Sequence, residues 1–350
     1  MKKLGIVFKY LKRIDVMKDY LSNDKMDLKP KTDYREPFLK FDFPGIKVGI
    51  GEYEEGPTGC TVIQVLKNNM MYVDVRGGAV GVIGQHWGFT NAVCFSGGSL
   101  YGFEAISGVT AELLKQNNYS PDWETIPIVN GAIIFDVGFR ANTIYPDKEL
   151  GRLAVSSARE GILPIGNQGA GKSATVGKNL DYNSAQLGGQ GGAFKQIGDT
   201  KIFVCTVVNS VGAIMNKKGE IVRGFWDDSK EQRLDLLKEI SKKSENENNK
   251  KEQNATTKNT TLTVVITNQK MDRYGLTQMG RQVHTSMARA INPFHTITDG
   301  DVLFMISTNE VEIKKLDLTS LGVVASEVAW DAVLSCYEEN QKGKVYKKID

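Results

Sequence analysis

One boundary constrains the fold of this chain more than any other feature of its sequence. Residues 238–258 read KEISKKSENENNKKEQNATTK, with no large apolar residue after Ile240. Such a segment cannot bury enough surface to offset the entropy lost on ordering, so we predict a flexible linker. It ends at residues 261–266, TLTVVI, whose composition is typical of a core strand. The linker therefore runs directly into the core, and it divides a single domain over residues 1–350 rather than joining two.

The other apolar runs of the 350-residue chain predict a mixture of strands and helices. Strands are expected at 45–53, 60–66, 71–78, 126–137, 201–209, 261–268 and 301–308, with a hairpin at 213–224. Helices are expected at 99–117, 146–160, 273–292 and 318–339, where apolar residues recur at helical spacing. Because strands and helices do not alternate strictly, the pattern favours an α+β fold with helices stacked on a mixed or antiparallel sheet.

Charge and composition exclude several classes of function. The chain has 44 basic and 41 acidic residues, and the net charge of +3 gives no electrostatic footprint for nucleic acid. No run of 18 apolar residues is present, so no membrane span is expected. In residues 1–21, basic side chains break the apolar run and no small-residue cleavage site follows. We therefore expect an amphipathic first segment, not a signal peptide, and a cytoplasmic protein.

Cysteines and histidines are few and scattered. The four cysteines lie far apart in apolar contexts, which is typical of buried reduced thiols (Cys60, Cys94, Cys205 and Cys336). The three histidines cannot complete a His-rich metal site with them, so we expect no metal and no cofactor. The same scarcity weakens any proposal of a Ser-His-Asp or Cys-His enzyme.

Residues 166–173, GNQGAGKS, match the G-x-x-x-x-G-K-S pattern of a phosphate-binding loop. That loop needs a strand before it and a helix after it, because the amides at the helix N-terminus hold the phosphates. Here the preceding run, 161–165, is short, and residues 174–192 are rich in glycine and poor in helix propensity. A P-loop nucleotide-binding protein is therefore the weaker alternative. A glycine-rich loop that lines a site by close backbone approach is the stronger one.

The junction between Asn259 and Thr260 carries the chemistry that the sequence favours. A cut there would make Thr260 a new N-terminus at the head of a core strand. A threonine hydroxyl is a poor nucleophile alone, but an N-terminal threonine carries its own base, an α-amino group with a pKa of about 8. This arrangement needs no histidine, which suits a chain with only 3 of them.

Two carboxylates follow in the run TDGDVLFM. Asp299 and Asp301 are two positions apart, so both side chains point to one face if a strand begins there. Beside an ammonium and a hydroxyl they would orient both groups. Taken alone, a D-G pair more often marks a solvated turn before a strand.

These residues resemble those of a known family. The segments NTTLTVVITN and ITDGDVLF are similar to those of N-terminal-nucleophile hydrolases of the P1 peptidase family. That family contains L-aminopeptidase/D-esterases, β-peptidyl aminopeptidases and nylon-oligomer (6-aminohexanoate oligomer) endo-hydrolases. The resemblance extends through PGIKVGIGEY, TGCTVI, SGGSLYGFEAISGV, GAGKSATVGK and GGQGG, over residues 44–340. The Asn-Thr junction and the D-G-D element resemble the nylon-oligomer branch most, since aminopeptidase relatives usually have serine as nucleophile.

The resemblance implies a self-cleaving precursor with a four-layer αββα sandwich. Cleavage between Asn259 and Thr260 would give an α chain, 1–259, and a β chain, 260–350, that stay together. It also implies a homo-oligomer, a tetramer of processed αβ units, that hydrolyses linear aliphatic amides through an acyl-enzyme. The alternative within the family is an aminopeptidase or D-esterase.

The same resemblance assigns roles to residues. Thr260 matches the nucleophile and, through its amine, the base, while Asp299 and Asp301 match the carboxylates near it. Asn209 matches the asparagine whose side-chain amide donates to the oxyanion, worth about 3 kcal/mol for such a donor. Taken alone, Asn209 fits an ordinary turn residue at the end of a strand.

One lysine matches the family pattern, and two other residues differ from it. Lys178 matches an active-site lysine of the nylon branch, which would lower the pKa of the amine by charge repulsion, and Lys172 is the competing assignment. Phe135 stands where the family often has an oxyanion tyrosine, so one hydroxyl donor is lost. Ile133 stands where aminopeptidase relatives have a glutamate for the free amine of the substrate. The loss of that anion favours an endo-amidase with an apolar cleft.

Overall fold

The computed structural model describes residues 20–84, 87–140, 142–178, 182–245, 259–312 and 316–337. The expected amphipathic segment, except for its last two residues, lies outside the described residues. So do the predicted linker after residue 245 and the last two residues of the helix expected at 318–339. None of the helices in the described ranges is both long enough and apolar enough to cross a membrane.

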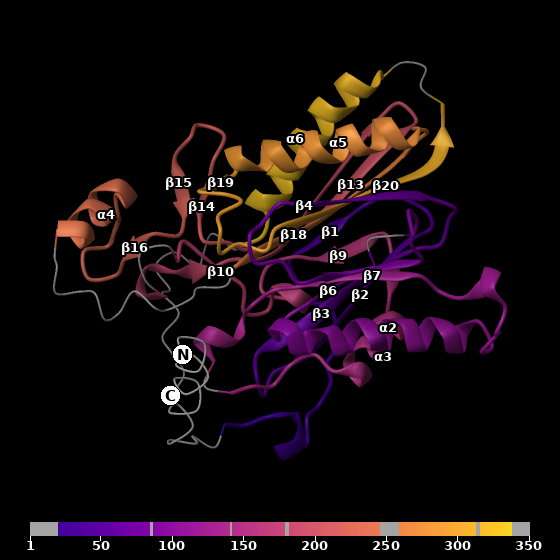
Figure 1. The fold of residues 1–350 in the computed structure, drawn as a ribbon, viewed down its shortest axis with the longest axis horizontal. Coiled ribbons are helices and arrows are strands. Elements are labelled where there is room, and N and C mark those ends of the chain that lie inside the picture. Colours follow the sequence, from indigo (N-terminus) through magenta and orange to yellow (C-terminus); the bar gives the residue numbers. More distant parts are fainter. Residues whose placement is uncertain are drawn as a thin grey trace, which may run out of the picture.

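Two sheets lie face to face at the centre of the molecule (Figure 1). The first has the strand order β12 (Gly189–Ile197), β13 (Thr200–Asn209), β18 (Thr260–Gln269), β20 (Val302–Val311), β4 (Met70–Val75). The second has the order β5 (Val82–Ile83), β7 (Val129–Ile133), β6 (Ala92–Ser96), β3 (Thr58–Val65), β2 (Ile46–Tyr53), β8 (Arg159–Glu160). Within these sheets β18 is parallel to β20 and β6 to β7, and the other neighbours are antiparallel.

The pattern of β18 shows how the layers form. Side chains of a strand point alternately to its two faces. Leu262, Val264 and Ile266 point into the core between the two sheets, whereas Val265 belongs to the core under the helices. All ten residues of β18 are buried, because both faces of this central strand are covered. Its segment from Leu262 to Ile266, in which only Thr263 is polar, is typical of a strand that is buried on both faces.

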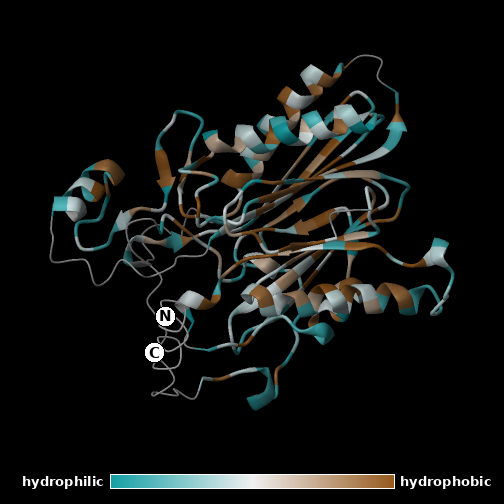
Figure 2. Ribbon diagram, in the orientation of Figure 1, coloured by the Kyte–Doolittle hydropathy of each residue, from teal (hydrophilic) through white to brown (hydrophobic). Residues whose placement is uncertain are grey.

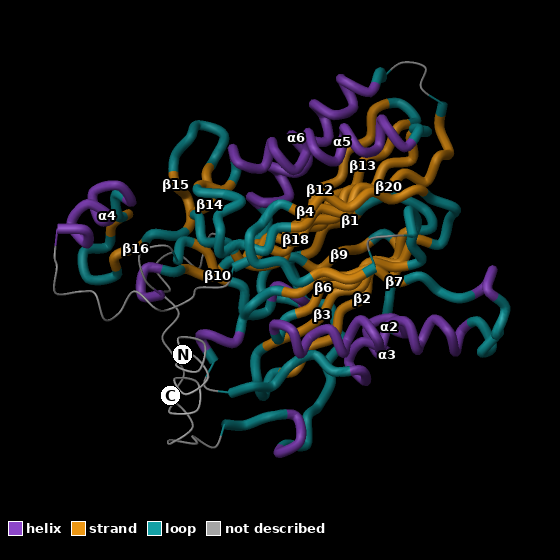
Figure 3. The backbone as a smooth tube through the Cα atoms, in the orientation of Figure 1, coloured by secondary structure: helices purple, strands orange, loops and turns teal. Residues whose placement is uncertain are grey.

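Helices cover the outer face of each sheet (Figures 1 and 3). α5 (Arg273–Ser286) and α6 (Leu318–Leu334) pack on the first sheet, and α2 (Phe103–Gln116) and α3 (Lys148–Ser156) pack on the second. An aspartate caps the N-terminus of α3, α5 and α6 by accepting from a backbone amide of the first turn. Figure 2 shows apolar strands between helices of mixed hydropathy. The four-layer αββα prediction is confirmed.

The remaining elements are short and lie around the sandwich. Small sheets pair β1 (Phe38–Lys40) with β9 (Ile162–Pro164), β10 (Thr175–Val176) with β11 (Gln186–Leu187), β14 (Ala213–Met215) with β15 (Ile221–Arg223) and β19 (Ile291–Asn292), and β16 (Trp226–Asp227) with β17 (Gln232–Arg233). The 3-10 helices are η1 (Asn23–Lys25), η2 (Ser99–Gly102), η3 (Trp123–Thr125), η4 (Val137–Phe139), η5 (Gly169–Gly171), η6 (Tyr182–Ser184) and η8 (Met287–Arg289).

The structure differs from the sequence-based expectations in several places. The helices expected at 146–160 and 273–292 end earlier, at Ser156 and Ser286, and the short strands β8 and β19 occupy their last residues. The strand expected at 126–137 is limited to β7. Within the two central sheets, β5, β6 and β12 form where neither a strand nor a helix is expected, as do several of the short strands around them. Residues 238–245 of the predicted linker are helical and belong to α4 (Leu236–Glu245). Leu236 at its start packs against a small core that contains Phe225. The linker prediction rests on the polar residues after Ile240, and it does not take into account this apolar contact at the first residue of α4.

Candidate active site

The sheet topology brings three separate segments to one sheet edge. β13 and β18 are antiparallel, so Asn209 at the end of β13 pairs with Thr260 at the start of β18. β20 is parallel to β18, so the residues just before β20 lie beside the start of β18. Asn259 forms a bridge there with Asp299. The predicted nucleophile, asparagine and carboxylates therefore meet in space.

The chain is continuous and buried between Asn259 and Thr260, which are 0% and 3% exposed. Thr260 Oγ1 donates to the carbonyl oxygen of Asn259 at 2.5 Å. The backbone amide of Gly300 donates to the same oxygen at 2.7 Å. An N–H group therefore already contacts the oxygen that would become negative if the hydroxyl attacked this peptide bond.

Asp299 is fully buried and held by hydrogen bonds from two residues. Its Oδ1 accepts from the amide of Val211 at 3.2 Å. Its Oδ2 accepts from the amide and the hydroxyl of Thr296 at 3.1 and 2.6 Å. Burial, and then the charge of Asp301, raise the pKa of Asp299 to about 6 despite these bonds. A carboxyl group with such a pKa exchanges a proton near neutral pH.

Asp301 is also fully buried but has different partners. Its Oδ1 accepts from the backbone amide of Thr261, the residue after the predicted nucleophile, at 2.7 Å. Since β20 begins at Val302, both aspartates precede the strand, and strand alternation does not set their directions. In the described part of the chain, no hydrogen bond joins either carboxylate to Thr260. Their influence on it passes through the backbone and through charge.

Lys178 lies beside Asn209 with its side chain 1% exposed. Its Nζ donates to the backbone oxygen of Asn209 at 3.0 Å and to the side-chain Oδ1 at 2.8 Å. Burial lowers the pKa of Lys178 to about 7, although the charges of Asp299 and Asp136 oppose this shift. Of the two candidate lysines, Lys178 is the one that the structure places at this sheet edge.

Lys172 and the phosphate-loop motif have a different role. Lys172 forms ion pairs with Glu52 at 3.0 Å and Glu54 at 2.6 Å. Two amides of residues 166–173 donate to the side chains of Glu52 and Thr61, at 2.7 and 2.9 Å. The motif contains a three-residue 3-10 helix, η5, and the elements that follow it directly in the described chain are β10 and η6, not an α-helix. The Glu52 carboxylate thus occupies one loop amide and the Lys172 ammonium, two groups that would bind a phosphate, so the P-loop alternative is not supported.

Asn209 and Phe135 are also in contact. Asn209 Nδ2 donates to the backbone oxygen of Phe135 at 3.1 Å, and its Oδ1 accepts from the amide of Thr175 at 3.0 Å. In the uncut chain the amide that the resemblance assigns to the oxyanion is thus bound to the protein itself. Ile133, the other departure from the family pattern, is 6% exposed and places no charge in β7.

The sequence offers no signal for one further residue at this edge. His295 Nδ1 lies 3.0 Å from Asp301 Oδ2, and the His295 backbone amide donates to the same oxygen at 3.1 Å. Nothing in the spacing of the run INPFHTITDGD indicates that this histidine binds that carboxylate. No group of three or more histidines, cysteines, aspartates and glutamates in the described ranges could hold a metal ion.

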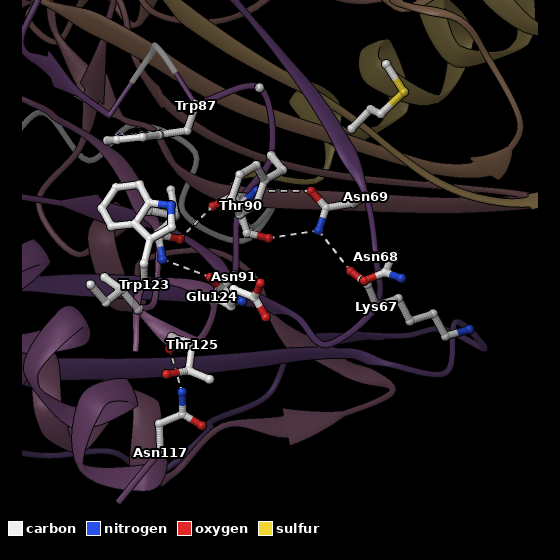
Figure 4. A pocket seen from close by; sticks show the side chains of 15 residues that line it. Lys67, Asn68, Asn69, Trp87, Thr90, Asn91, Asn117, Trp123, Glu124 and Thr125 are labelled. Carbon is white, nitrogen blue, oxygen red and sulfur yellow. Dashed lines mark hydrogen bonds between the residues drawn. The ribbon is translucent and has the colours of Figure 1, made fainter. Parts of the chain in front are cut away.

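A separate pocket of about 920 Å³, drawn with its lining side chains in Figure 4, includes Met70 at the first residue of β4. It is lined by Met70 at the start of β4 and by the ring pair of Trp87 and Trp123, whose centroids are 5.4 Å apart. The other end of β4, at Val75, pairs with Val302 beside the aspartates. The pocket therefore does not include the junction at Thr260.

Comparison with known proteins agrees with this geometry. The model of Peptidase family S58 matches residues 41–342. The chain belongs to Peptidase family S58. It is 40% identical over 333 residues to the 6-aminohexanoate-oligomer endohydrolase of Agromyces sp. (strain KY5R), with 89% of each chain covered. The resemblance to nylon-oligomer hydrolases that the sequence indicates is confirmed.

Two solved structures share the fold of this Peptidase family S58 chain. The beta-aminopeptidase of Burkholderia sp. has a TM-score of 0.61 at 14% identity, covering 84% of both chains. The L-aminopeptidase D-Ala-esterase/amidase of Ochrobactrum anthropi, described as a variant of the Ntn-hydrolase fold, has a TM-score of 0.60 at 14% identity, covering 87% of this chain and 88% of that one. The family and its relatives support an amide-bond hydrolase.

Proposed function

We propose that this chain cleaves itself between Asn259 and Thr260 and then uses Thr260 to hydrolyse linear aliphatic amides such as 6-aminohexanoate oligomers. The observation that carries the proposal is the hydrogen bond of 2.5 Å between the Thr260 hydroxyl and the Asn259 carbonyl oxygen. The identity of 40% to an enzyme named for 6-aminohexanoate oligomers supports the substrate class.

Self-cleavage proceeds as an acyl shift followed by hydrolysis. The Thr260 oxygen bonds to the carbonyl carbon of Asn259, and the hydroxyl proton passes to the peptide nitrogen as the C–N bond breaks. The amide of Gly300 stabilises the negative oxygen of the tetrahedral intermediate. Water then hydrolyses the ester. The products are a carboxylate on Asn259 and a Thr260 with a free hydroxyl and a free α-amine.

Turnover repeats this chemistry on a substrate amide. The α-amine of Thr260 takes the hydroxyl proton and passes it to the leaving amine, and water then hydrolyses the acyl-enzyme. The departure of Asn259 frees the Gly300 amide for the substrate oxygen. Lys178, whose pKa is lowered to about 7, places a charge near this edge that depends on pH. A positive charge there favours the neutral, basic form of the amine.

The apolar side chain at Ile133 supports cleavage within a chain rather than removal of a terminal residue. A carboxylate at this position would bind the free amine of a substrate, and Ile133 offers none. We therefore propose endo-hydrolysis. The aminopeptidase and D-esterase alternative predicts the opposite preference for a free amine.

Intact mass and N-terminal sequencing of the purified protein test self-cleavage. The expected products span residues 1–259 and 260–350, with threonine as the new N-terminus. Thr260→Ala should remain one chain and be inactive. Thr261→Ala is the matched control, because Thr261 Oγ1 has no hydrogen-bond partner in the described part of the chain. A Thr260→Ala protein that is still cleaved after residue 259 would refute the proposal.

Substrate comparison tests the second half of the proposal. A 6-aminohexanoate oligomer and its N-acetylated form should be cleaved at similar rates by an endo-hydrolase. A dipeptide amide with a free amine should be the poorer substrate. Strict dependence on the free amine would instead identify an aminopeptidase.

A further inference from the structure

The side chain of His295 lies between the Asp301 carboxylate and a second histidine. Its Nδ1 is 3.0 Å from Asp301 Oδ2, and its ring centroid is 4.4 Å from that of His284. The neighbouring ring of Phe294 has its centroid 3.9 Å away. These contacts leave the His295 side chain 19% exposed and fix the direction of its imidazole.

Two features of His295 are unfavourable for local stability. Its backbone φ is +58°, in the left-handed region that residues with a side chain rarely adopt. Its Nε2 is buried and has no hydrogen-bond partner among the described residues. Such local costs persist where the surroundings require a particular geometry, and they concentrate at functional sites.

The requirement that explains these costs is the position of Asp301. The imidazole and the backbone amide of His295 both contact Asp301 Oδ2. The other oxygen, Oδ1, holds the amide of Thr261 at 2.7 Å. With both oxygens engaged, the carboxylate plane cannot rotate, and the first peptide group of β18 after Thr260 is fixed.

A second histidine–carboxylate pair packs against the pair of His295 and Asp301. His284 on α5 has its Nδ1 2.9 Å from Asp74 Oδ2 on β4. Asp74 also accepts from Arg76 Nε at 2.6 Å. Burial lowers the pKa of His284, so its ring is neutral at neutral pH. The contact between His284 on α5 and Asp74 on β4 therefore fixes the imidazole against which the His295 ring packs.

We infer that His295 is a positioning residue for the reaction: through Asp301 and the Thr261 amide it holds Thr260 in the geometry that attacks a carbonyl group. This role rests on the proposed function of Thr260. His295 itself need not touch the substrate.

Two variants of His295 that both accept the left-handed backbone test the inference. His295→Asn keeps a side-chain N–H that can reach Asp301, whereas His295→Gly keeps the backbone conformation and loses the donor. The Gly protein should self-cleave at least about tenfold more slowly, and its processed form should lose kcat by about tenfold or more with KM changed less than about twofold. The Asn protein should restore both rates to within about threefold of the natural chain. Thermal denaturation should show both variants folded.

The outcomes separate this inference from the proposed function. A Gly variant that cleaves and turns over like the natural chain, which itself is cleaved before Thr260, overturns the role of His295 alone. A natural chain that is never cleaved there overturns both. If the Gly variant does not fold, His295→Asp takes its place, since it tolerates the same φ but repels Asp301. A His295→Asp protein with the natural rates likewise overturns the inference.

Discussion

The hydroxyl of Thr260 donates to the carbonyl oxygen of Asn259, the residue before it, at 2.5 Å. The parallel pairing of β18 with β20 adds a second donor, because it places the Gly300 amide 2.7 Å from the same oxygen. A carbonyl group that accepts two hydrogen bonds is polarised toward attack at its carbon. In the uncut chain the Asn259 carbonyl group is therefore the one at which the proposed self-cleavage would begin.

Gly300→Ala should slow self-cleavage. An added Cβ would lie 2.7 Å from Thr260 Oγ1 and 2.7 Å from the backbone oxygen of Ala79, so the hydroxyl or the turn must shift. A displacement of the reacting atoms by about 1 Å lowers the rate by about 100-fold. Intact mass against time measures the rate, and Thr298→Ala in the same turn is the control that should stay close to the natural rate. Equal rates for Gly300→Ala and the natural chain would contradict the prediction.

Asn209→Asp should separate turnover from self-cleavage. The carboxylate still accepts from Lys178 but has no N–H to donate, so a substrate oxyanion loses one donor and kcat falls about 100-fold. Self-cleavage should fall less than kcat, because the Gly300 amide stabilises that oxyanion and the uncut chain loses only the Asn209 Nδ2 bond to the Phe135 oxygen. Intact mass and steady-state kinetics measure the two rates. Loss of self-cleavage with unchanged turnover would show that the Asn209 amide acts in self-cleavage and not on the substrate oxyanion.

The sequence locates the start of β18 because two local signals meet there. Residues 246–258 are polar, and the run from Thr261 to Ile266 is apolar and rich in β-branched side chains. Both are properties of neighbouring residues, which a single sequence displays. The roles proposed for Asn209 and Lys178 follow only from the resemblance. A single sequence does not display their proximity to Thr260, because it depends on the pairing of β13 with β18 and on the contact of Lys178 with Asn209.

Two features were beyond the sequence for different physical reasons. β12 begins GQGG, which lowers strand propensity, but its glycines let α6 approach: a Cβ on Gly191 would lie 1.9 Å from the backbone oxygen of Ala332. The role of His295 depends on its left-handed backbone and on a turn that returns Asp301 to it. Neither close approach leaves a periodic pattern.

Asp299→Asn should remove a pH dependence of stability from the uncut Thr260→Ala protein. Burial, and then the charge of Asp301, raise the folded-state pKa of Asp299 to about 6, so the folded chain binds this proton more tightly than the unfolded chain. The contribution of Asp299 to the free energy of unfolding is therefore largest below pH of about 4. It falls by roughly 3 kcal/mol as the pH rises from about 4 to about 6. Urea denaturation across this range, compared between parent and variant, measures the difference.

The matched control is Asp317→Asn at the start of α6. Hydrogen bonds from the amide and hydroxyl of Ser320 lower the pKa of Asp317, so its contribution has the opposite sign and is lost as pH falls. A parent and an Asp299→Asn protein with parallel stability curves from pH of about 4 to 6 would show that Asp299 is not the proton-binding group.

Lys178→Met should flatten the pH dependence of the stability of the uncut Thr260→Ala protein between pH of about 7 and about 10. Burial lowers the folded-state pKa of Lys178 to about 7, so the unfolded chain binds the proton more tightly. The parent should therefore gain stability as pH rises from about 7 towards about 10, and the Met protein should lack this gain.

Lys172→Met is the control. It breaks ion pairs with Glu52 and Glu54, so it should lose stability. Urea midpoints at a series of pH values measure all three proteins. A Lys178→Met protein that keeps the parent's slope would show that Lys178 remains charged in the folded chain.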